Sequence, residues 1–285
     1  MFALKSRWVR QAILWGVLLV SVANRAGAEP GDRKRLGQPG EWANTVAGTT
    51  IKNRLYTVEA DGTLYSTDLN SGKWQRVGTT KFPKARFLLA AGSSLFTVLG
   101  DGSLYRVNSS TGLKKRLGSP GAWKNAIRAT MVNGQLYFVT TKGLYRTNMT
   151  TGKWQQVSKD DYGNTRFMLG RDKGRYVQTG LFTIEADGTL YDIKPADGKW
   201  KAVGENGTWN GNKAAIIASG TLYIVDAKGV LNQAHLDGTM TTPMGKPEFT
   251  STQYLFAAQG NSGPQLYALD KNGSLYSVEM APLAG

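Results

Sequence analysis

A repeat of 40 to 45 residues limits the folds that are open to this chain. Each copy begins with Leu and an aromatic residue, and a second Leu follows eight or nine positions later, with a glycine turn between them. Turns such as Asp-Gly or Asn-Gly between alternating apolar residues are hairpin signals, because glycine tolerates a positive φ. The six pairs are Leu55-Tyr56, Leu95-Phe96, Leu136-Tyr137, Leu181-Phe182, Leu222-Tyr223 and Leu266-Tyr267.

Each repeat has room for two strands besides the hairpin. A short strand follows the hairpin after a second turn, and a strand of small or apolar residues precedes it. Four antiparallel strands in a unit of this length are typical of a propeller blade. We therefore predict an all-β fold, a six-bladed β-propeller with four antiparallel strands per blade. The expected blades are residues 43–79, 83–119, 124–158, 163–204, 210–245 and 250–280.

The last repeat ends after its third strand, and the missing strand has a counterpart near the N-terminus. Arg33-Lys34-Arg35-Leu36-Gly37 matches Lys114-Lys115-Arg116-Leu117-Gly118, the expected outer strand of the second repeat. We expect residues 33–38 to complete blade six as its outer strand. Such closure would leave no unpaired sheet edge at the seam.

The N-terminus predicts export. Residues 1–28 combine a basic start, an apolar run of 12 residues and the small-residue site Ala26-Gly27-Ala28, which together indicate a cleaved secretory signal. The run is too short to span a bilayer, which needs about 20 residues. We expect residues 29–285 to form one domain without a membrane span, monomeric and either periplasmic or extracellular.

Charge suggests two interpretations of the surface. Without residues 1–28 the chain has 31 basic and 20 acidic residues, and many basic ones fall in the expected outer strands. Lysine on an exposed edge prevents strand-to-strand aggregation. The same residues could hold the protein on anionic polysaccharide. Specific nucleic-acid binding is not expected, because no base-reading module is present.

The sequence offers little for catalysis. It has no cysteine, and His235 is its only histidine. The expected inner strands, which would line the central tunnel, contain no Asp, Glu or His and therefore no general base or hard-metal ligand. We predict that the protein is not an enzyme, with no catalytic residue, no metal site and no cofactor.

Two sets of aromatic residues recur once per blade. One set follows the outer strands in the loops, as Trp42, Phe82, Trp123, Tyr162, Trp209 and Phe249. These rings could stack on sugars beside neighbouring amides, or they could wedge between blades as core. The other set, Trp74, Trp154 and Trp200, lies in the expected outer strands, and we expect it to pack between blades.

The segment from Arg116 to Asn125, followed by Gly134-Gln135-Leu136-Tyr137, resembles the repeat of tachylectin-2-type and tectonin propellers. That resemblance implies multivalent binding of N-acetylated or otherwise modified sugars, with one site per blade or blade junction. The positions that match the motif, and hence the candidate ligand-binding residues, are Trp42, Asn44, Trp123, Asn125, Trp209 and Asn210.

Three functions follow from these observations. The first is an exported, lectin-like module that binds glycans or cell-envelope polysaccharide. The second is a propeller scaffold that binds another protein in the periplasm or at the cell surface. A lactonase-like enzyme ranks last, because the expected tunnel strands lack carboxylates.

Overall fold

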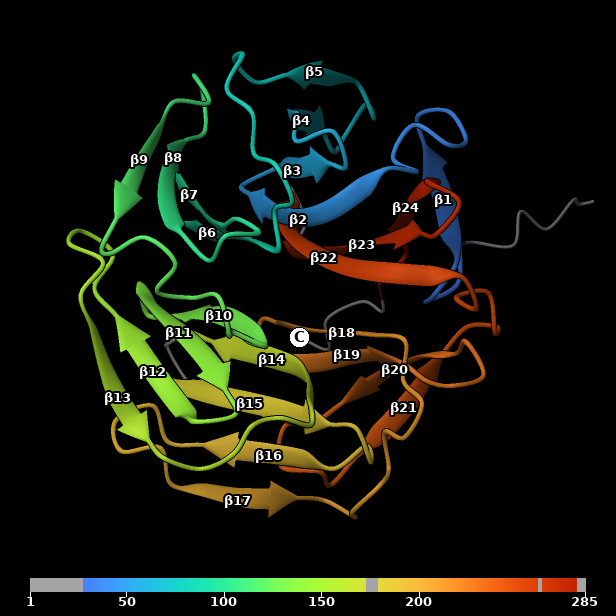
Figure 1. Cartoon of the computed structure of the whole chain (residues 1–285). Coiled ribbons are helices and arrows are strands. Elements are labelled where there is room, and N and C mark those ends of the chain that lie inside the picture. Colours follow the sequence, from blue (N-terminus) through green and yellow to red (C-terminus); the bar gives the residue numbers. More distant parts are fainter. Residues whose placement is uncertain (1–27, 173–178, 261–262, 281–285) are drawn as a thin grey trace, which may run out of the picture.

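The computed structural model describes residues 28–172, 179–260 and 263–280, and residues 1–27 of the predicted signal peptide lie outside this range. The described chain forms six four-stranded antiparallel sheets. Figure 1 shows them arranged as blades around a central axis. The prediction of a six-bladed β-propeller is confirmed.

Each blade runs outward from the axis in chain order, and the first three blades are continuous in sequence. Blade 1 contains β2 (Thr45–Ile51), β3 (Arg54–Glu59), β4 (Leu64–Asp68) and β5 (Trp74–Arg76). Blade 2 contains β6 (Phe87–Ala91), β7 (Ser94–Val98), β8 (Leu104–Asn108) and β9 (Lys114–Leu117). Blade 3 contains β10 (Arg128–Val132), β11 (Gln135–Thr140), β12 (Gly143–Thr147) and β13 (Trp154–Ser158).

The remaining blades follow the same pattern, except that the last one takes its outer strand from the other end of the chain. Blade 4 contains β14 (Thr165–Arg171), β15 (Gly180–Glu185), β16 (Leu190–Ile193) and β17 (Trp200–Val203). Blade 5 contains β18 (Ala214–Ala218), β19 (Thr221–Val225), β20 (Leu231–Ala234) and β21 (Thr241–Met244). Blade 6 contains β22 (Thr252–Gly260), β23 (Gly263–Asp270), β24 (Leu275–Val278) and β1 (Arg33–Leu36).

The seam lies inside blade 6. Strand β1 pairs antiparallel with β24, with Arg33 opposite Val278 and Leu36 opposite Leu275. The predicted closure by the N-terminal strand is confirmed. Figure 1 shows β1 in blue beside the red strands of the C-terminal region.

The Leu-aromatic pair of each hairpin joins a blade to both of its neighbours. Adjacent residues of a strand point to opposite faces of the sheet. In blade 1, Leu55 packs in a cluster with Leu269 and Leu275 of blade 6, whereas Tyr56 packs in a cluster with Leu95 of blade 2. The repeated pair is therefore the element that packs one blade against the next.

The hairpin turns also touch the next blade. Gly188 has φ +86°, and a Cβ at this position would lie 2.0 Å from the backbone nitrogen of Asn210. Both the backbone angle and the close approach require glycine. The Asp-Gly turn of blade 4 is thus fixed against the loop that opens blade 5. Among the described residues, no helix has the length and apolar character to cross a bilayer.

Candidate functional site

The loop aromatics lie between blades. Trp42, Trp123 and Trp209 are 3%, 3% and 8% exposed. The backbone nitrogen of Trp42 donates to Gly273 of blade 6, and its indole nitrogen donates to Thr67 Oγ1 at 3.2 Å. Of the two interpretations given above, the structure shows the core wedge: the three rings are buried between blades. A part for these residues in ligand binding stays a prediction.

The candidate amides do not occupy one equivalent position. Asn44 and Asn125 are exposed and each lies two residues after its tryptophan, whereas Asn210 directly follows Trp209. The position equivalent to Asn44 in blade 5 is therefore Gly211. Only Asn44, together with Trp42, lines a cavity described below.

The outer-strand tryptophans are exposed, and the prediction that they pack between blades was wrong. Trp74, Trp154 and Trp200 are 46%, 53% and 54% exposed. Each contacts a tyrosine of the adjacent strand edge to face, with ring centroids 5.0 to 5.3 Å apart: Tyr65–Trp74, Tyr145–Trp154 and Tyr191–Trp200. The outer strand forms the edge of each sheet, and these three side chains lie on its exposed side.

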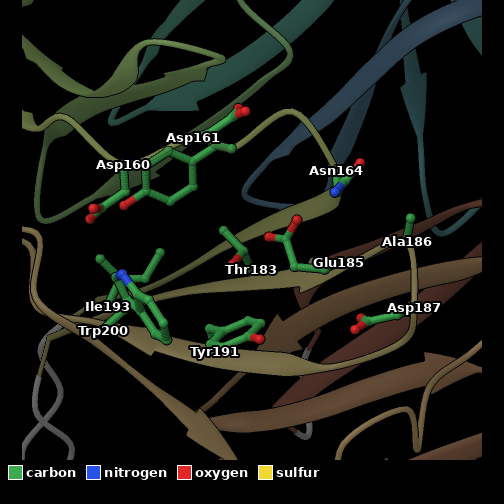
Figure 2. Close-up of a pocket in the computed structure, with 11 residues that line it drawn as sticks. Asp160, Asp161, Asn164, Thr183, Glu185, Ala186, Asp187, Tyr191, Ile193 and Trp200 are labelled. Atoms are coloured by element: carbon green, nitrogen blue, oxygen red, sulfur yellow. The ribbon is translucent and has the colours of Figure 1, made fainter.

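A cavity of about 580 Å³ opens beside Trp200 in blade 4. The loop before β14 and the strands β15 to β17 supply its walls. Figure 2 shows Asp160 and Asp161 on one side and Thr183, Glu185 and Tyr191 on the other. Its lining residues are Asp160, Asp161, Tyr162, Asn164, Thr183, Glu185, Ala186, Asp187, Tyr191, Ile193 and Trp200.

Blade 1 has the same cavity, with a volume of about 430 Å³. Both cavities share five features: the loop aromatic, the amide, the Thr-x-Glu-Ala-Asp segment of the second strand and its turn, the tyrosine and the outer-strand tryptophan. The lining residues here are Glu41, Trp42, Asn44, Thr57, Glu59, Ala60, Asp61, Tyr65 and Trp74. Because six blades surround the axis in chain order, blades 1 and 4 lie opposite each other.

The glutamate in each cavity is partly desolvated. Burial raises the pKa of Glu185 and of Glu59, against the opposing effect of hydrogen bonds from threonines. Thr165 Oγ1 donates to Glu185 at 2.9 Å, and Thr45 Oγ1 donates to Glu59 at 2.8 Å. The neighbouring Asp187 and Asp161 raise the pKa of Glu185 further.

The two cavities differ in whether a lysine neutralises their carboxylates. In blade 1, Lys81 Nζ lies 2.7 Å from Asp61 and lowers the pKa of that carboxyl below its usual range. In blade 4, the lining includes four carboxylates and no Lys or Arg. A strongly acidic cavity therefore lies on a protein whose net charge is positive.

Blade 3 has the same tyrosine and tryptophan, but a phenylalanine lies beneath them. Phe138 takes the place of Thr183, and it stacks on Trp123 with centroids 3.9 Å apart and planes 18° apart. Thr140 takes the place of Glu185. The phenyl ring fills the space that is open in blade 4.

The mouth of the central tunnel is basic and apolar. Arg86, Arg128 and Arg166 line it, and they tie neighbouring blades together. For example, Arg86 Nη1 donates to Lys124 O at 2.8 Å, and Arg166 Nη2 donates to Asn212 O at 2.9 Å. No Asp, Glu or His is among the residues that line this mouth. In the described parts of the chain, no three His, Cys, Asp or Glu side chains are grouped as metal ligands.

Sequence reasoning missed the residues that make the two cavities. Glu59 and Glu185 stand at equivalent ends of the second strand, and each is preceded two residues earlier by Thr. That shared Thr-x-Glu pattern, absent from the other four blades, is the signal that could have singled out blades 1 and 4.

No protein-family model matches the sequence, and no curated protein is similar to it. Solved structures share the fold. A protein of unknown function from Bacteroides thetaiotaomicron has a TM-score of 0.62 at 15% identity over 88% of this chain and 73% of its own. YCF48 bound to D1 peptide has a TM-score of 0.55 at 14% identity, covering 85% and 79%.

PorZ of Porphyromonas gingivalis, an essential surface component of the type-IX secretion system, has a TM-score of 0.52 at 12% identity. The match covers 89% of this chain but only 40% of PorZ. At these identities the likeness concerns the fold alone, and it does not assign the chain to the tachylectin-2 or tectonin family. The chain is a six-bladed β-propeller, similar in fold to YCF48 and PorZ, with matching acidic cavities on blades 1 and 4.

Proposed function

We propose that this chain is an exported binding propeller that holds a partner polypeptide at the cavities of blades 1 and 4. The observation that carries the proposal is the repetition of one lining on two opposite blades. Polar and aromatic side chains that converge on a concave site are typical of ligand binding. Packing between blades does not require this convergence, because blades 3 and 5 pack without it.

Two of the structural neighbours support a polypeptide partner and an envelope location. YCF48 was solved with a bound peptide, and PorZ is a bacterial surface component. The predicted signal peptide is compatible with such a location. Binding rather than catalysis also fits the lining of the tunnel mouth, where arginines and apolar residues occupy the place in which a lactonase-like enzyme would need carboxylates. The proposal requires no metal and no cofactor.

Carbohydrate is the second candidate ligand. Trp74 and Trp200 are about half exposed and stand beside carboxylates and an amide, Asn44 or Asn164. An indole face can stack on a sugar while carboxylates and amides accept or donate hydrogen bonds to hydroxyls. In this arrangement the stacking residues are Trp74 and Trp200, which are more exposed than Trp42, Trp123 and Trp209.

Peptide and glycan arrays test the proposal with three forms of the protein. The Trp74→Ala/Trp200→Ala double variant removes the exposed wall of both cavities, and Trp154→Ala removes an equally exposed tryptophan from blade 3, where that space is filled. We expect peptides that bind the wild type and Trp154→Ala to lose binding to the double variant. Melting curves show whether each variant is folded.

The outcomes separate the candidates. Glycan spots that follow this pattern in place of peptides would establish the carbohydrate function. Peptides that bind the double variant as well as the wild type, or an array without binding, would overturn the proposal that these cavities are the ligand sites.

A further inference from the structure

Each outer strand has one residue at the position of Trp200, which stands beside the cavity in blade 4. This position pairs with the residue three places after the second leucine of the hairpin. In blades 1 and 4 it is Trp74 and Trp200, opposite Thr67 and Ile193. In blades 2 and 6 it is a cation, Lys114 opposite Val107 and Arg33 opposite Val278.

In blade 6, the guanidinium of Arg33 fills the space that is open in blade 4. Its Cζ lies 3.8 Å from the ring centroid of Tyr276 and 4.9 Å from that of Phe249. Its Nη2 lies 2.8 Å from Asp270 Oδ2, and the two side chains are 7% and 5% exposed. The basic outer strands were expected to point to solvent, and for Arg33 that expectation was wrong.

The walls around Arg33 have direct counterparts in blade 4. Tyr276 follows the second leucine of its hairpin, as Tyr191 does, and Phe249 is the loop aromatic, as Tyr162 is. Asp270 ends the second strand at the position of Glu185. Blade 6 therefore shows which ligand chemistry this set of walls accepts: a planar cation on aromatic faces, paired with a carboxylate.

Blade 2 repeats the aromatic part of the arrangement with an ammonium group, although Leu99 stands at the position of Glu185. Lys114 Nζ lies 5.0 Å from the ring centroid of Tyr105 and 5.3 Å from that of Phe82, and it donates to Lys81 O at 2.8 Å. Thus two blades whose outer strand supplies a cation hold it at the aromatic walls. Three blades have tryptophan at this position. In blades 1 and 4 the walls remain and the space is open, whereas in blade 3, which has Trp154, Phe138 stacks on the loop tryptophan beneath it.

We infer that the cavities of blades 1 and 4 bind the guanidinium group of an arginine side chain that a partner polypeptide supplies. This inference rests on the proposed function and names the group that is recognised. In blade 4, Tyr191 and Trp200 offer ring faces, and Glu185 with Asp187, Asp160 and Asp161 offers carboxylates. Blade 1 is the weaker site, because Lys81 already pairs with Asp61.

Arginine suits the cavities better than lysine. Its guanidinium is flat, so it can lie on an aromatic ring and still donate two parallel hydrogen bonds to one carboxylate. A sugar would leave the carboxylates without a counter-charge, in a cavity that burial has partly desolvated. Of the two internal cations, the one that pairs with a carboxylate, in blade 6, is an arginine.

Titration calorimetry with a blocked pentapeptide, Gly-Gly-Arg-Gly-Gly, tests the inference on the purified protein. The same peptide with citrulline is the control, because citrulline keeps the shape of arginine and removes its charge. We expect two sites for the arginine peptide and at least tenfold weaker binding of the citrulline peptide. Equal affinity for the two peptides would overturn the inference.

Variants locate the sites. Glu185→Gln should weaken binding at one site by about tenfold, as expected when a charge-assisted hydrogen bond is replaced by a neutral one. Glu205→Gln, an exposed carboxylate in the loop after β17, should leave both sites unchanged. Trp200→Arg should place an internal cation in blade 4, as Arg33 does in blade 6, and reduce two sites to one. Two sites retained in Trp200→Arg would contradict the inference.

Failure of the inference can be distinguished from failure of the proposed function. If array peptides bind through the cavities but tolerate replacement of their arginines by citrulline, the cavities are ligand sites of another specificity. If no peptide depends on Trp74 and Trp200, both proposals fall.

Discussion

Blades 3 and 4 share a conspicuous pair of aromatic residues and differ in what lies beneath it. Tyr145 with Trp154 and Tyr191 with Trp200 have nearly the same edge-to-face geometry. Under the first pair, Phe138 stacks on the loop tryptophan and fills the space. Under the second, Thr183 leaves a cavity of about 580 Å³ with a glutamate in its wall.

The difference shows that two positions of the second strand distinguish a blade with a site from one without, beneath the same tyrosine and tryptophan. The exposed tryptophan marks the place but does not create the cavity. A threonine two residues before a glutamate creates it, and a phenylalanine two residues before a threonine closes it. The residue at the position of Thr183 and Phe138 therefore either leaves a binding cavity or fills it by packing. Exchanging these residues between blades 3 and 4 tests the comparison.

The largest expected loss of stability comes from blade 6, where Arg33 fills the space that is open in blade 4. Arg33→Met would leave the carboxylate of Asp270 buried without its cation, and removing one partner of a buried ion pair costs about 3–5 kcal/mol. Urea denaturation of this variant measures the loss. Arg35→Met, an exposed position on the same strand, is the control. A loss below about 1 kcal/mol would mean that Arg33 does not neutralise Asp270.

Phe138→Thr should open blade 3. The free energy of unfolding should fall by about 3 kcal/mol, because a buried ring is lost and a cavity remains. This variant should still not bind the arginine peptide, because Thr140 supplies no carboxylate. The Phe138→Thr/Thr140→Glu double variant should gain a third site, detected by calorimetry. Binding by the single variant would show that the carboxylate is dispensable.

Thr183→Phe is the reverse exchange. The added ring enters open space, so we expect the stability to stay within about 1 kcal/mol of the wild type, while the arginine-peptide stoichiometry falls from two to one. Thermal melts and calorimetry measure both quantities. A folded variant that keeps two sites would separate the cavity of blade 4 from binding.

The smallest effect concerns pH. The folded-state pKa of Glu185 is raised above 4.5, chiefly by desolvation. Between the unfolded and folded pKa values the folded state holds more protons, so the stability should fall as pH rises through this window. Since the group is partly exposed, we expect less than about 1 kcal/mol. Denaturation from pH 4 to 7 should show this fall in the wild type and a weaker one in Glu185→Gln.

The sequence predicted the fold because each repeat contains, within about 42 residues, the turns and the apolar alternation that specify its strands. The Asp-Gly turns, the alternation around Leu55-Tyr56 and the match of residues 33–37 to an outer strand each specify pairing between nearby or homologous segments. All were confirmed by the six sheets and by β1. A repeat shows which residues are equivalent, and equivalence was sufficient to place the strands.

Knowing which residues are equivalent between repeats was not sufficient to locate the candidate site. Whether Trp42 or Trp74 faces solvent depends on the spacing between neighbouring blades, which a repeat does not contain. The loop set, for which both interpretations were open, is buried, and the outer-strand set, which was expected to pack between blades, is exposed. The cavities depend on departures from the repeat, Thr183 against Phe138, and a search for shared residues passes over departures.

The seam of blade 6 also has a consequence for the order in which the blades fold. It joins residues 33–36 to residues 275–278, so this pairing closes one of the longest loops available to the molecule. Contacts between residues so distant in sequence form late, because the entropy lost on closing the loop precedes the gain from pairing. The other five blades can each form from a continuous segment. We expect blade 6 to be the last to acquire protection from hydrogen exchange during refolding, and the first to lose it.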